Sequence, residues 1–98
     1  MINKYQTERL EKAARCLRTL AHPCRLQIIN LLSQRECPVQ ELEKELGISQ
    51  SSISQHLNLL KDKEIVTSRR AAQQVFYRLR DPRFLELISL TRELFCSE

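Results

Sequence analysis

The sequence contains very little glycine and proline, with one Gly and three Pro among its 98 residues. This scarcity argues against a glycine-rich loop that cradles phosphate and against a turn-rich all-β fold. Its apolar runs are only a few residues long, far short of the roughly 20 that a transmembrane helix needs. We therefore expect a mainly helical chain with no membrane partner.

The segment Met1–Arg9 lacks the apolar stretch of a secretory signal, which favours a cytoplasmic location. The chain is 42% hydrophobic and 29% charged, as is ordinary for a globular protein, so disorder is not expected. Its length leaves room for a single domain over residues 1–98 and for no separate catalytic module. We expect neither enzymatic activity nor a cofactor.

Charged side chains are absent from the segment Leu46–Leu60, although many of its residues are polar. Exposed helices usually carry Glu and Lys, whereas Ser, Gln and Asn can read the hydrogen-bonding pattern of base edges in the major groove. The alternative interpretations are a poorly charged loop or a buried polar helix. The residues that we expect to contact DNA here are Gln50, Ser51, Ser52, Ser54, Gln55, His56 and Asn58.

Acidic side chains are absent from residues 65–80, which carry four arginines and a charge of +4, equal to the net charge of the whole chain. A basic segment of this kind commonly contacts phosphate. The alternative is a solvated hairpin whose arginines pair with acids elsewhere in the fold. The residues expected to contact DNA from this segment are Arg69, Arg70 and Gln73.

Apolar residues recur at helical spacing in the first third of the chain. The pattern predicts one helix over about 4–21, ended by His22-Pro23, and a second helix that begins at Pro23 and reaches about Gln34. A short helix is expected over Val39–Leu46, with Pro38 near its N1 position. The thiol of Cys37 would then lie at a helix N-terminus, where the helix dipole lowers a thiol pKa and raises reactivity.

The only glycine, Gly47, directly follows this short helix, where a left-handed residue commonly ends a helix. Ser49 can cap the next helix, in which Ile53, Leu57 and Leu60 recur at i, i+4 and i+7. Helix, glycine-containing turn and helix together form a helix-turn-helix unit over about 38–61. The neutral polar residues fall mainly at the N-terminal end of its second helix, as in a recognition helix.

Residues 65–70 and 74–79 are rich in β-branched and aromatic residues and flank Ala71-Ala72-Gln73, which predicts a β-hairpin. The connection lacks Asn-Gly or Asp-Gly, so its turn type stays open. A basic hairpin that follows a recognition helix is a wing, here over about 65–80. Its arginines would bind flanking phosphates or enter the minor groove.

The last helix is expected over about 82–96, with Asp81 as its N-cap and Pro82 as its first residue. It is apolar around much of its circumference, and a domain of this size has little core left to cover both faces. The first and last helices are therefore the expected homodimer interface, although the last helix could instead only close its own core. A symmetric dimer predicts a palindromic operator in double-stranded DNA.

Three segments resemble the ArsR/SmtB family of winged helix-turn-helix repressors. Leu20–Ile29 is similar to the family's "L-x-H-P-x-R-L-x-I-L" opening, Gly47–Leu60 with Glu41-Leu42 to its recognition segment, and Val75–Leu79 to its second wing strand. The resemblance covers nearly the whole chain and implies a homodimeric repressor. Such a repressor leaves its operator when an inducer binds or modifies it.

The four cysteines, Cys16, Cys24, Cys37 and Cys96, are more in keeping with reactive or metal-binding thiols than with a disulfide framework. The last helix lacks the His ligands of zinc-sensing family members, and Pro38 and Gln40 stand where arsenic-, cadmium- or lead-sensing members carry Cys-x-Cys. Cys37 and Cys96 resemble the two cysteines of the sulfide- and persulfide-responsive subgroup (SqrR- and BigR-like repressors). That resemblance implies release from DNA when persulfide, polysulfide or another oxidant bridges the two thiols.

Other interpretations of the thiols stay open from the sequence. Arsenite or a thiophilic metal could be held by Cys37 and Cys96 with Cys16 or Cys24, or the thiols could be inert packing residues. A small thiol enzyme is a remote alternative, because the chain has no Cys-x-x-Cys pair and no positioned base. A dimerisation module without DNA binding is disfavoured by the intact recognition segment.

Overall fold

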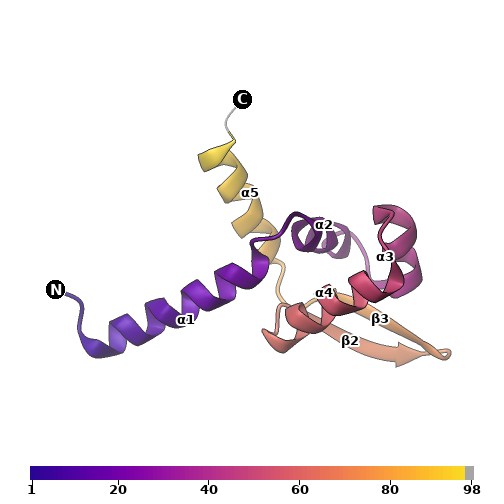
Figure 1. The fold of residues 1–98 in the computed structure, drawn as a ribbon, viewed down its shortest axis with the longest axis horizontal. Coiled ribbons are helices and arrows are strands. Elements are labelled where there is room, and N and C mark those ends of the chain that lie inside the picture. Colours follow the sequence, from indigo (N-terminus) through magenta and orange to yellow (C-terminus); the bar gives the residue numbers. More distant parts are fainter. Residues whose placement is uncertain (97–98) are drawn as a thin grey trace.

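The structure is a computed structural model that describes residues 1–96. Helices predominate, and a small sheet follows the fourth helix in the chain (Figure 1). The prediction of a mainly α fold with a β-hairpin, in winged helix-turn-helix order, is confirmed. The elements are α1 (Lys4–Leu20), α2 (Pro23–Leu32), β1 (Cys37–Pro38), α3 (Val39–Leu46), α4 (Gln50–Asp62), β2 (Val66–Ala71), β3 (Gln74–Leu79) and α5 (Arg83–Phe95).

The sheet has three antiparallel strands in the order β1-β3-β2. The hairpin strands pair from Val66 opposite Leu79 to Ala71 opposite Gln74. The two-residue strand β1 joins the other edge of β3, with Cys37 opposite Tyr77. This strand was not predicted from the sequence, because two residues are too short to show a strand periodicity. It ties the connection between α2 and α3 to the wing.

Side-chain caps set the starts of three helices. Asn3 and Gln6 form a capping box at α1, and the Nδ1 atom of His22 accepts from the Cys24 amide at the start of α2. Ser49 caps α4, and Gly47 ends α3 with φ 65° and ψ 32°, as predicted from the sequence. Because Gly47 and Ser49 set the end of α3 and the start of α4, the observed bounds of these two helices agree closely with those predicted from the sequence.

The bounds of α3 agree with the predicted helix over Val39–Leu46, and Pro38, expected near N1, is its extended N-cap (ψ 166°), because its backbone belongs to β1. The start of α5 differs from prediction by one residue. Pro82 precedes the first residue of α5, and Asp81 instead accepts from the Arg83 amide at 2.9 Å. Both prolines therefore still stop the preceding segment from being helical.

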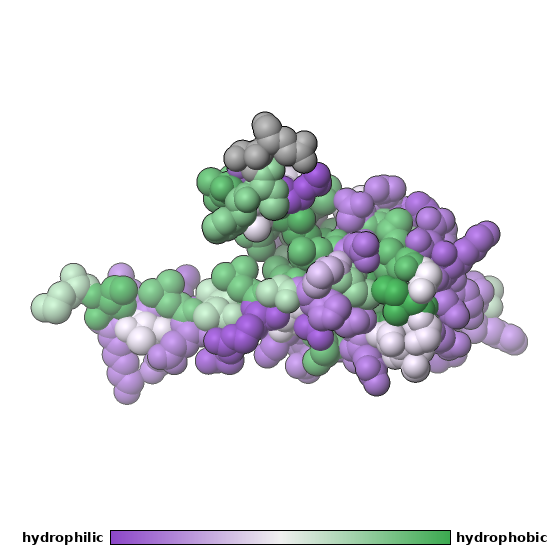
Figure 2. Space-filling view, turned by 45° about the horizontal axis from the view of Figure 1, so that its top comes forward, coloured by the Kyte–Doolittle hydropathy of each residue, from purple (hydrophilic) through white to green (hydrophobic). Residues whose placement is uncertain are grey.

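The buried core lies between Leu20 and Val66 and is built by α2, α3, α4 and the base of the wing. α1 contributes only Leu20 to it, and α5 contributes no fully buried residue. Figure 1 shows α1 extending away from the rest of the chain, and Figure 2 shows hydrophobic residues gathered along α1 and over α5. The buried residues are Leu20, Cys24, Ile28, Ile29, Leu32, Cys37, Leu42, Ile53, Leu57, Leu60, Ile65 and Val66.

Among residues 1–96, none of the helices combines the length and apolar character required to cross a membrane. The longest of them, α1, has 17 residues, and several of these are charged.

Candidate nucleic-acid interface and cysteine thiols

The outward face of α4 carries neutral polar side chains. The inward face buries Ile53, Leu57 and Leu60, which fixes the rotation of the helix about its axis. Of the α4 residues expected to contact DNA, Ser52, Ser54 and His56 are half-buried, and four are exposed. The exposed four are Gln50, Ser51, Gln55 and Asn58.

The serines at the start of α4 are partly engaged with one another. The Ser49 hydroxyl accepts from the Ser52 amide at 3.3 Å and donates to the Ser52 hydroxyl at 3.1 Å. It also lies 3.3 Å from the Ser51 hydroxyl. This network stabilises the first turn of α4, so the Ser52 side chain is engaged in the helix cap. The side chains of Gln50 and Gln55 are exposed.

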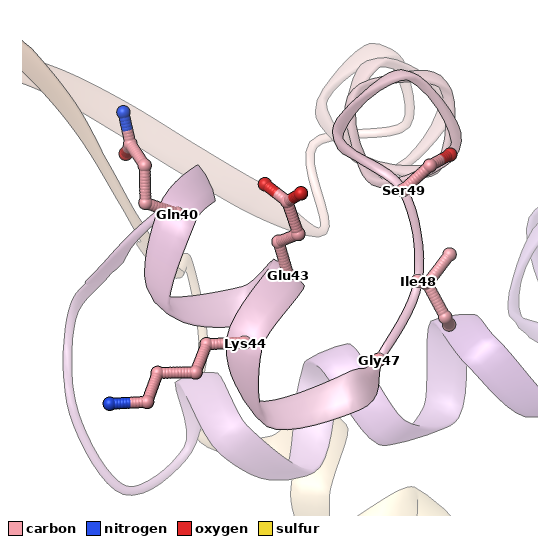
Figure 3. Close-up of a pocket in the computed structure, with 6 residues that line it drawn as sticks. All are labelled: Gln40, Glu43, Lys44, Gly47, Ile48 and Ser49. Carbon is pink, nitrogen blue, oxygen red and sulfur yellow. The ribbon is translucent and has the colours of Figure 1, made fainter.

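An open hollow of about 470 Å³ lies over the turn between α3 and α4. Figure 3 shows Gln40 and Glu43 extending from α3 on the side where α4 begins, while Lys44 extends away from the helix. Lys44 is exposed and lies about one turn before Gly47, on the first helix of the helix-turn-helix unit, the helix that crosses the DNA backbone in such units.

His56, which the sequence predicts to contact DNA, has partners within the chain. Its Nδ1 atom accepts from Arg25 Nε of α2 at 3.0 Å, and its ring lies 4.6 Å from that of His22. The side chain is therefore directed toward α2. The cause is its position one residue before buried Leu57, which places it at the edge of the inward face.

The wing arginines also have unequal surroundings. Arg69 makes a bidentate ion pair with Glu36, at 2.8 Å and 2.6 Å, and lies over the ring of Phe76. Arg78 donates to the Thr67 hydroxyl, and Arg80 donates to the Glu64 carbonyl. Three of the four arginines therefore have partners within the chain, but only Arg69 pairs with an acid, as the solvated-hairpin alternative expected of all four.

Arg70 differs from these three. Within residues 1–96 it has no ion-pair or hydrogen-bond partner. Arg70 follows Ser68 by two residues in β2, so the two side chains lie on the same face of the hairpin. The Ser68 hydroxyl accepts from Lys61 of α4 at 2.8 Å, so this face is the one toward α4. Arg70 is therefore the wing arginine whose side chain is unengaged on the side of the hairpin toward α4.

The wing ends in a two-residue turn at Ala72 and Gln73, which have φ of 50° and 66°. Two consecutive left-handed residues define a type I′ turn, which settles the turn type left open by the sequence. Both residues are exposed, so Gln73 stands at the tip of the wing, where minor-groove contact is expected.

The expected lowering of the Cys37 pKa is wrong. Cys37 is fully buried, and burial together with the nearby Glu41 carboxylate raises the pKa of its thiol from 9.0 to about 11. Its Sγ donates to the Arg35 carbonyl at 3.5 Å. Because the thiol faces the core and an acid, desolvation outweighs the dipole of an eight-residue helix.

The remaining cysteines belong to three different segments of the chain. Cys96 is exposed just after α5, Cys24 is buried in α2, and Cys16 is half-buried on α1; all four cysteines are free thiols. Burial raises the pKa of Cys24. Within residues 1–96, no three His, Cys, Asp or Glu side chains gather as a metal site.

Comparison with known proteins identifies the family. The family model for bacterial regulatory proteins of the arsR family matches residues 22–68, from the His22-Pro23 start of α2 into the wing. The biofilm growth-associated repressor of Xylella fastidiosa is 36% identical over 98 residues, which cover 100% of this chain and 86% of that protein. The chain belongs to the ArsR family.

Solved structures agree with this ArsR-family assignment. The crystal structure of the transcriptional repressor BigR from Xylella fastidiosa has a TM-score of 0.81 at 36% identity and covers 100% of both chains. A homodimeric winged helix-turn-helix DNA-binding domain from Mycobacterium bovis has a TM-score of 0.81 at 27% identity, covering 94% of this chain and 88% of that chain. The ArsR-family chain is thus a transcriptional regulator rather than an enzyme.

Proposed function

We propose that this chain is a single-domain repressor that binds a palindromic operator as a homodimer and leaves it when Cys37 and Cys96 are oxidised or bridged by sulfur. The observation that carries the DNA-binding half is the outward face of α4, which is polar and exposed and bears no charged residue from Leu46 to Leu60. A neutral face of this kind suits hydrogen bonding to base edges.

The proposed contacts divide by chemistry. Gln50, Ser51, Ser54, Gln55 and Asn58 read bases from α4, and Ser52 orders its first turn. Arg70 and Gln73 contact the backbone or minor groove from the wing, and Arg69 does so only after it leaves Glu36. Lys44 binds phosphate beside the turn. His56 is assigned no base contact, because Arg25 holds it.

Homodimerisation is supported by the apolar surface of α1 and α5. Figure 2 shows this surface following one side of α1 and continuing over α5. The homodimeric Mycobacterium bovis domain shares the fold. A symmetric pair would place two recognition helices about one DNA turn apart, roughly 34–36 Å. The large apolar side chains exposed on these helices are Tyr5, Leu10, Leu17, Leu87, Leu90, Leu94 and Phe95.

Selection of bound fragments from genomic DNA, followed by fluorescence anisotropy on the recovered site, tests the operator proposal. Affinity should fall steeply with salt, because each neutralised phosphate releases counterions. Gln55→Ala should relax base preference at a fixed position of the half-site, whereas Arg70→Ala should weaken all sequences about equally. A chain that enriches no sequence contradicts the proposal, and a reporter that falls on deletion of the gene contradicts repression.

The sensor half is supported by the contrast between the two thiols. Exposed Cys96 is accessible to a sulfur donor, whereas the thiolate of Cys37 is scarce because its pKa is about 11. We infer that the Cys96 thiolate attacks a polysulfide first, forming a Cys96 persulfide and releasing a polysulfide shorter by one sulfur atom. The Cys37 thiolate then attacks Sγ of that persulfide, which forms the disulfide and expels hydrosulfide.

Closing this bond requires movement. Figure 1 shows the end of α5 pointing away from the connection between α2 and α3, where Cys37 lies. A disulfide needs Cα atoms roughly 4.4–6.8 Å apart. Either α5 swings within one chain, or Cys96 meets Cys37 of a second copy. Either route would disturb β1, which joins Cys37 to the wing through Tyr77.

Mass spectrometry of polysulfide-treated protein, paired with operator binding, tests the sensor. Cys37→Ser and Cys96→Ser should stay on DNA after treatment, while the matched control Cys16→Ser should be released like the wild type. Non-reducing electrophoresis separates a bridge within one chain from one between two chains. Release of both variants by polysulfide contradicts the dithiol proposal while leaving DNA binding intact.

Arsenite is the second candidate inducer, through Cys37 and Cys96 with Cys16 or Cys24. The dispersed cysteines of the described residues do not favour it. Release of the operator by arsenite, lost in Cys16→Ser or Cys24→Ser, would replace the sulfur proposal with this one.

A further inference from the structure

A cluster of two histidines and one arginine joins three helices behind the DNA-facing surface. Arg25 of α2 donates through Nε to His56 of α4 at 3.0 Å and through Nη1 to the Thr19 carbonyl near the end of α1 at 2.9 Å. The ring of His22, the N-cap of α2, lies 4.6 Å from the ring of His56. One guanidinium therefore spans from the terminal helix to the recognition helix.

Both imidazoles in this cluster accept hydrogen bonds through Nδ1. The Cys24 amide donates to His22 Nδ1 at 3.1 Å, and Arg25 Nε donates to His56 Nδ1. An imidazolium carries a proton on both nitrogens and can only donate. Protonation of His56 would therefore set one N–H against another and break its bond to Arg25, and protonation of His22 would remove the cap of α2.

The charges around the cluster also disfavour protonation of His56. The titratable groups whose charge affects the pKa of His56 are Arg25 of α2 and His22, the N-cap of α2. From α1, the Thr19 carbonyl accepts a hydrogen bond from Arg25. Within residues 1–96, Arg25 has no salt-bridged carboxylate partner, and no acid contributes to the shift of His56. Burial, then His22 and Arg25, lower the pKa of His56. The surroundings of His56 thus favour a neutral ring beside one fixed positive charge.

We propose that Arg25, His22 and His56 are positioning residues that hold the recognition helix α4 against α1 and α2, and that operator binding requires both imidazoles to be uncharged. This inference rests on the proposed function only in needing a specific DNA site. It does not depend on the sensor thiols. Acid would then release α4 from its fixed orientation without removing any residue that touches DNA.

The test is operator affinity as a function of pH, between about pH 5 and 8 where histidine titrates. Acid alone adds positive charge to the chain and should strengthen binding to phosphate. We expect instead a loss of roughly tenfold or more for the wild type toward pH 5, because α4 loses its anchor. This opposite sign separates the cluster from a general charge effect.

Asparagine variants give the decisive control. In His56→Asn the Oδ1 atom stands near the place of Nδ1 and accepts from Arg25 at any pH, and in His22→Asn the side chain is a favoured N-cap. The double variant should bind the operator at pH 8 like the wild type and change its affinity with acid by less than about threefold. An acid-induced loss in the double variant equal to that of the wild type would overturn the proposal.

Arg25→Lys tests the anchor at neutral pH, because an ammonium cannot match the two directed bonds of the guanidinium. Operator affinity should fall about fivefold or more while the far-ultraviolet circular dichroism stays native. Arg18→Lys, an exposed arginine of α1, is the matched control and should bind normally. If the wild-type protein binds no operator at pH 8, the proposed function itself is contradicted. If the wild type binds and the Arg25→Lys variant binds with the same affinity, only the positioning role of Arg25 is overturned.

Discussion

The part of the chain from α2 to β3 buries many apolar side chains, whereas the two terminal helices bury almost none. Eleven of the twelve buried residues lie between Cys24 and Val66, whereas the 17 residues of α1 contribute one and the 13 of α5 none. Both terminal helices are nevertheless rich in exposed leucine. The helix-turn-helix and wing therefore have their own core, while the ends of the chain carry the apolar surface that we propose a second copy covers.

This difference separates two kinds of residue that look alike in the sequence. Leu42 and Leu90 both belong to amphipathic helices, yet Leu42 is 0% exposed and Leu90 is 51% exposed. Hydrophobic burial in the first region should determine whether the chain folds, and in the second whether it pairs. Because a dimeric operator-binding protein needs both, function should fail by two distinguishable routes.

Leu42→Ala should have the largest effect on folding. Truncation of a fully buried leucine costs about 2–5 kcal/mol, so thermal and urea unfolding should shift strongly. The matched change Leu90→Ala should leave the concentration-independent part of stability almost unchanged and raise the dimer dissociation constant in analytical ultracentrifugation. Equal losses of folding stability in the two variants would remove the distinction between the regions.

The reactivities of Cys37 and Cys96 test the same difference in burial between the core and the terminal helices. Cys37, in the core, should be alkylated by iodoacetamide at neutral pH about 100-fold more slowly than in urea, since its pKa rises from 9.0 to about 11 and only the thiolate reacts. The rate should increase with pH up to about 11, the pKa of the buried thiol. Cys96, in the terminal region, should react at similar rates in native and unfolded protein. Fast native labelling of Cys37 would contradict its burial.

Gly47→Ala tests the joint within the DNA-binding unit. Apart from its chain neighbours, no heavy atom lies within 4 Å of the place that a Cβ at Gly47 would take, so the cost comes from its φ of 65° alone. A non-glycine residue in this region costs about 1 kcal/mol, which chemical denaturation can resolve. Gly47→Asn should cost less, since Asn tolerates left-handed backbone better. A loss above roughly 3 kcal/mol would show that the turn has a second constraint.

Glu36→Gln should have the smallest effect, because it breaks only an exposed ion pair. Arg69 would be free to bind phosphate, so the slope of log affinity against log salt should steepen by about 0.9. Arg69→Ala supplies the reference, and adding Glu36→Gln to it should change nothing further. An unchanged slope in Glu36→Gln would show that Arg69 never reaches DNA.

Features encoded by neighbouring residues were predictable from the sequence. The helices followed from apolar periodicity, and the turn at Gly47 and the cap at Ser49 followed from local backbone preferences. Contacts between distant residues were not predictable in this way. Cys37 of β1 pairs with Tyr77, far along the chain, and Glu36 meets Arg69 33 residues away.

The error about Cys37 has the same origin. The dipole of α3 is visible in the sequence, but the layer of core that covers the thiol is not. Likewise, the sequence does not distinguish His56 from its polar neighbour Gln55, because the hydrogen bond from Arg25 of α2 to His56 depends on the packing of α2 against α4. Sequence periodicity indicated the face of each helix, whereas the partner of each polar side chain required the packed structure.

The type I′ turn at the tip of the wing contains no glycine, since Ala72 and Gln73 both adopt left-handed backbone. Each residue holds its conformation at a cost of order 1 kcal/mol. Because a change of shape at the tip would recover part of this cost, we expect the loop to deform more readily than a relaxed turn. In the proposed complex with DNA, the wing tip should therefore adapt to the width of the groove before α4 shifts, and flanking sequence should affect affinity less than the bases that α4 reads.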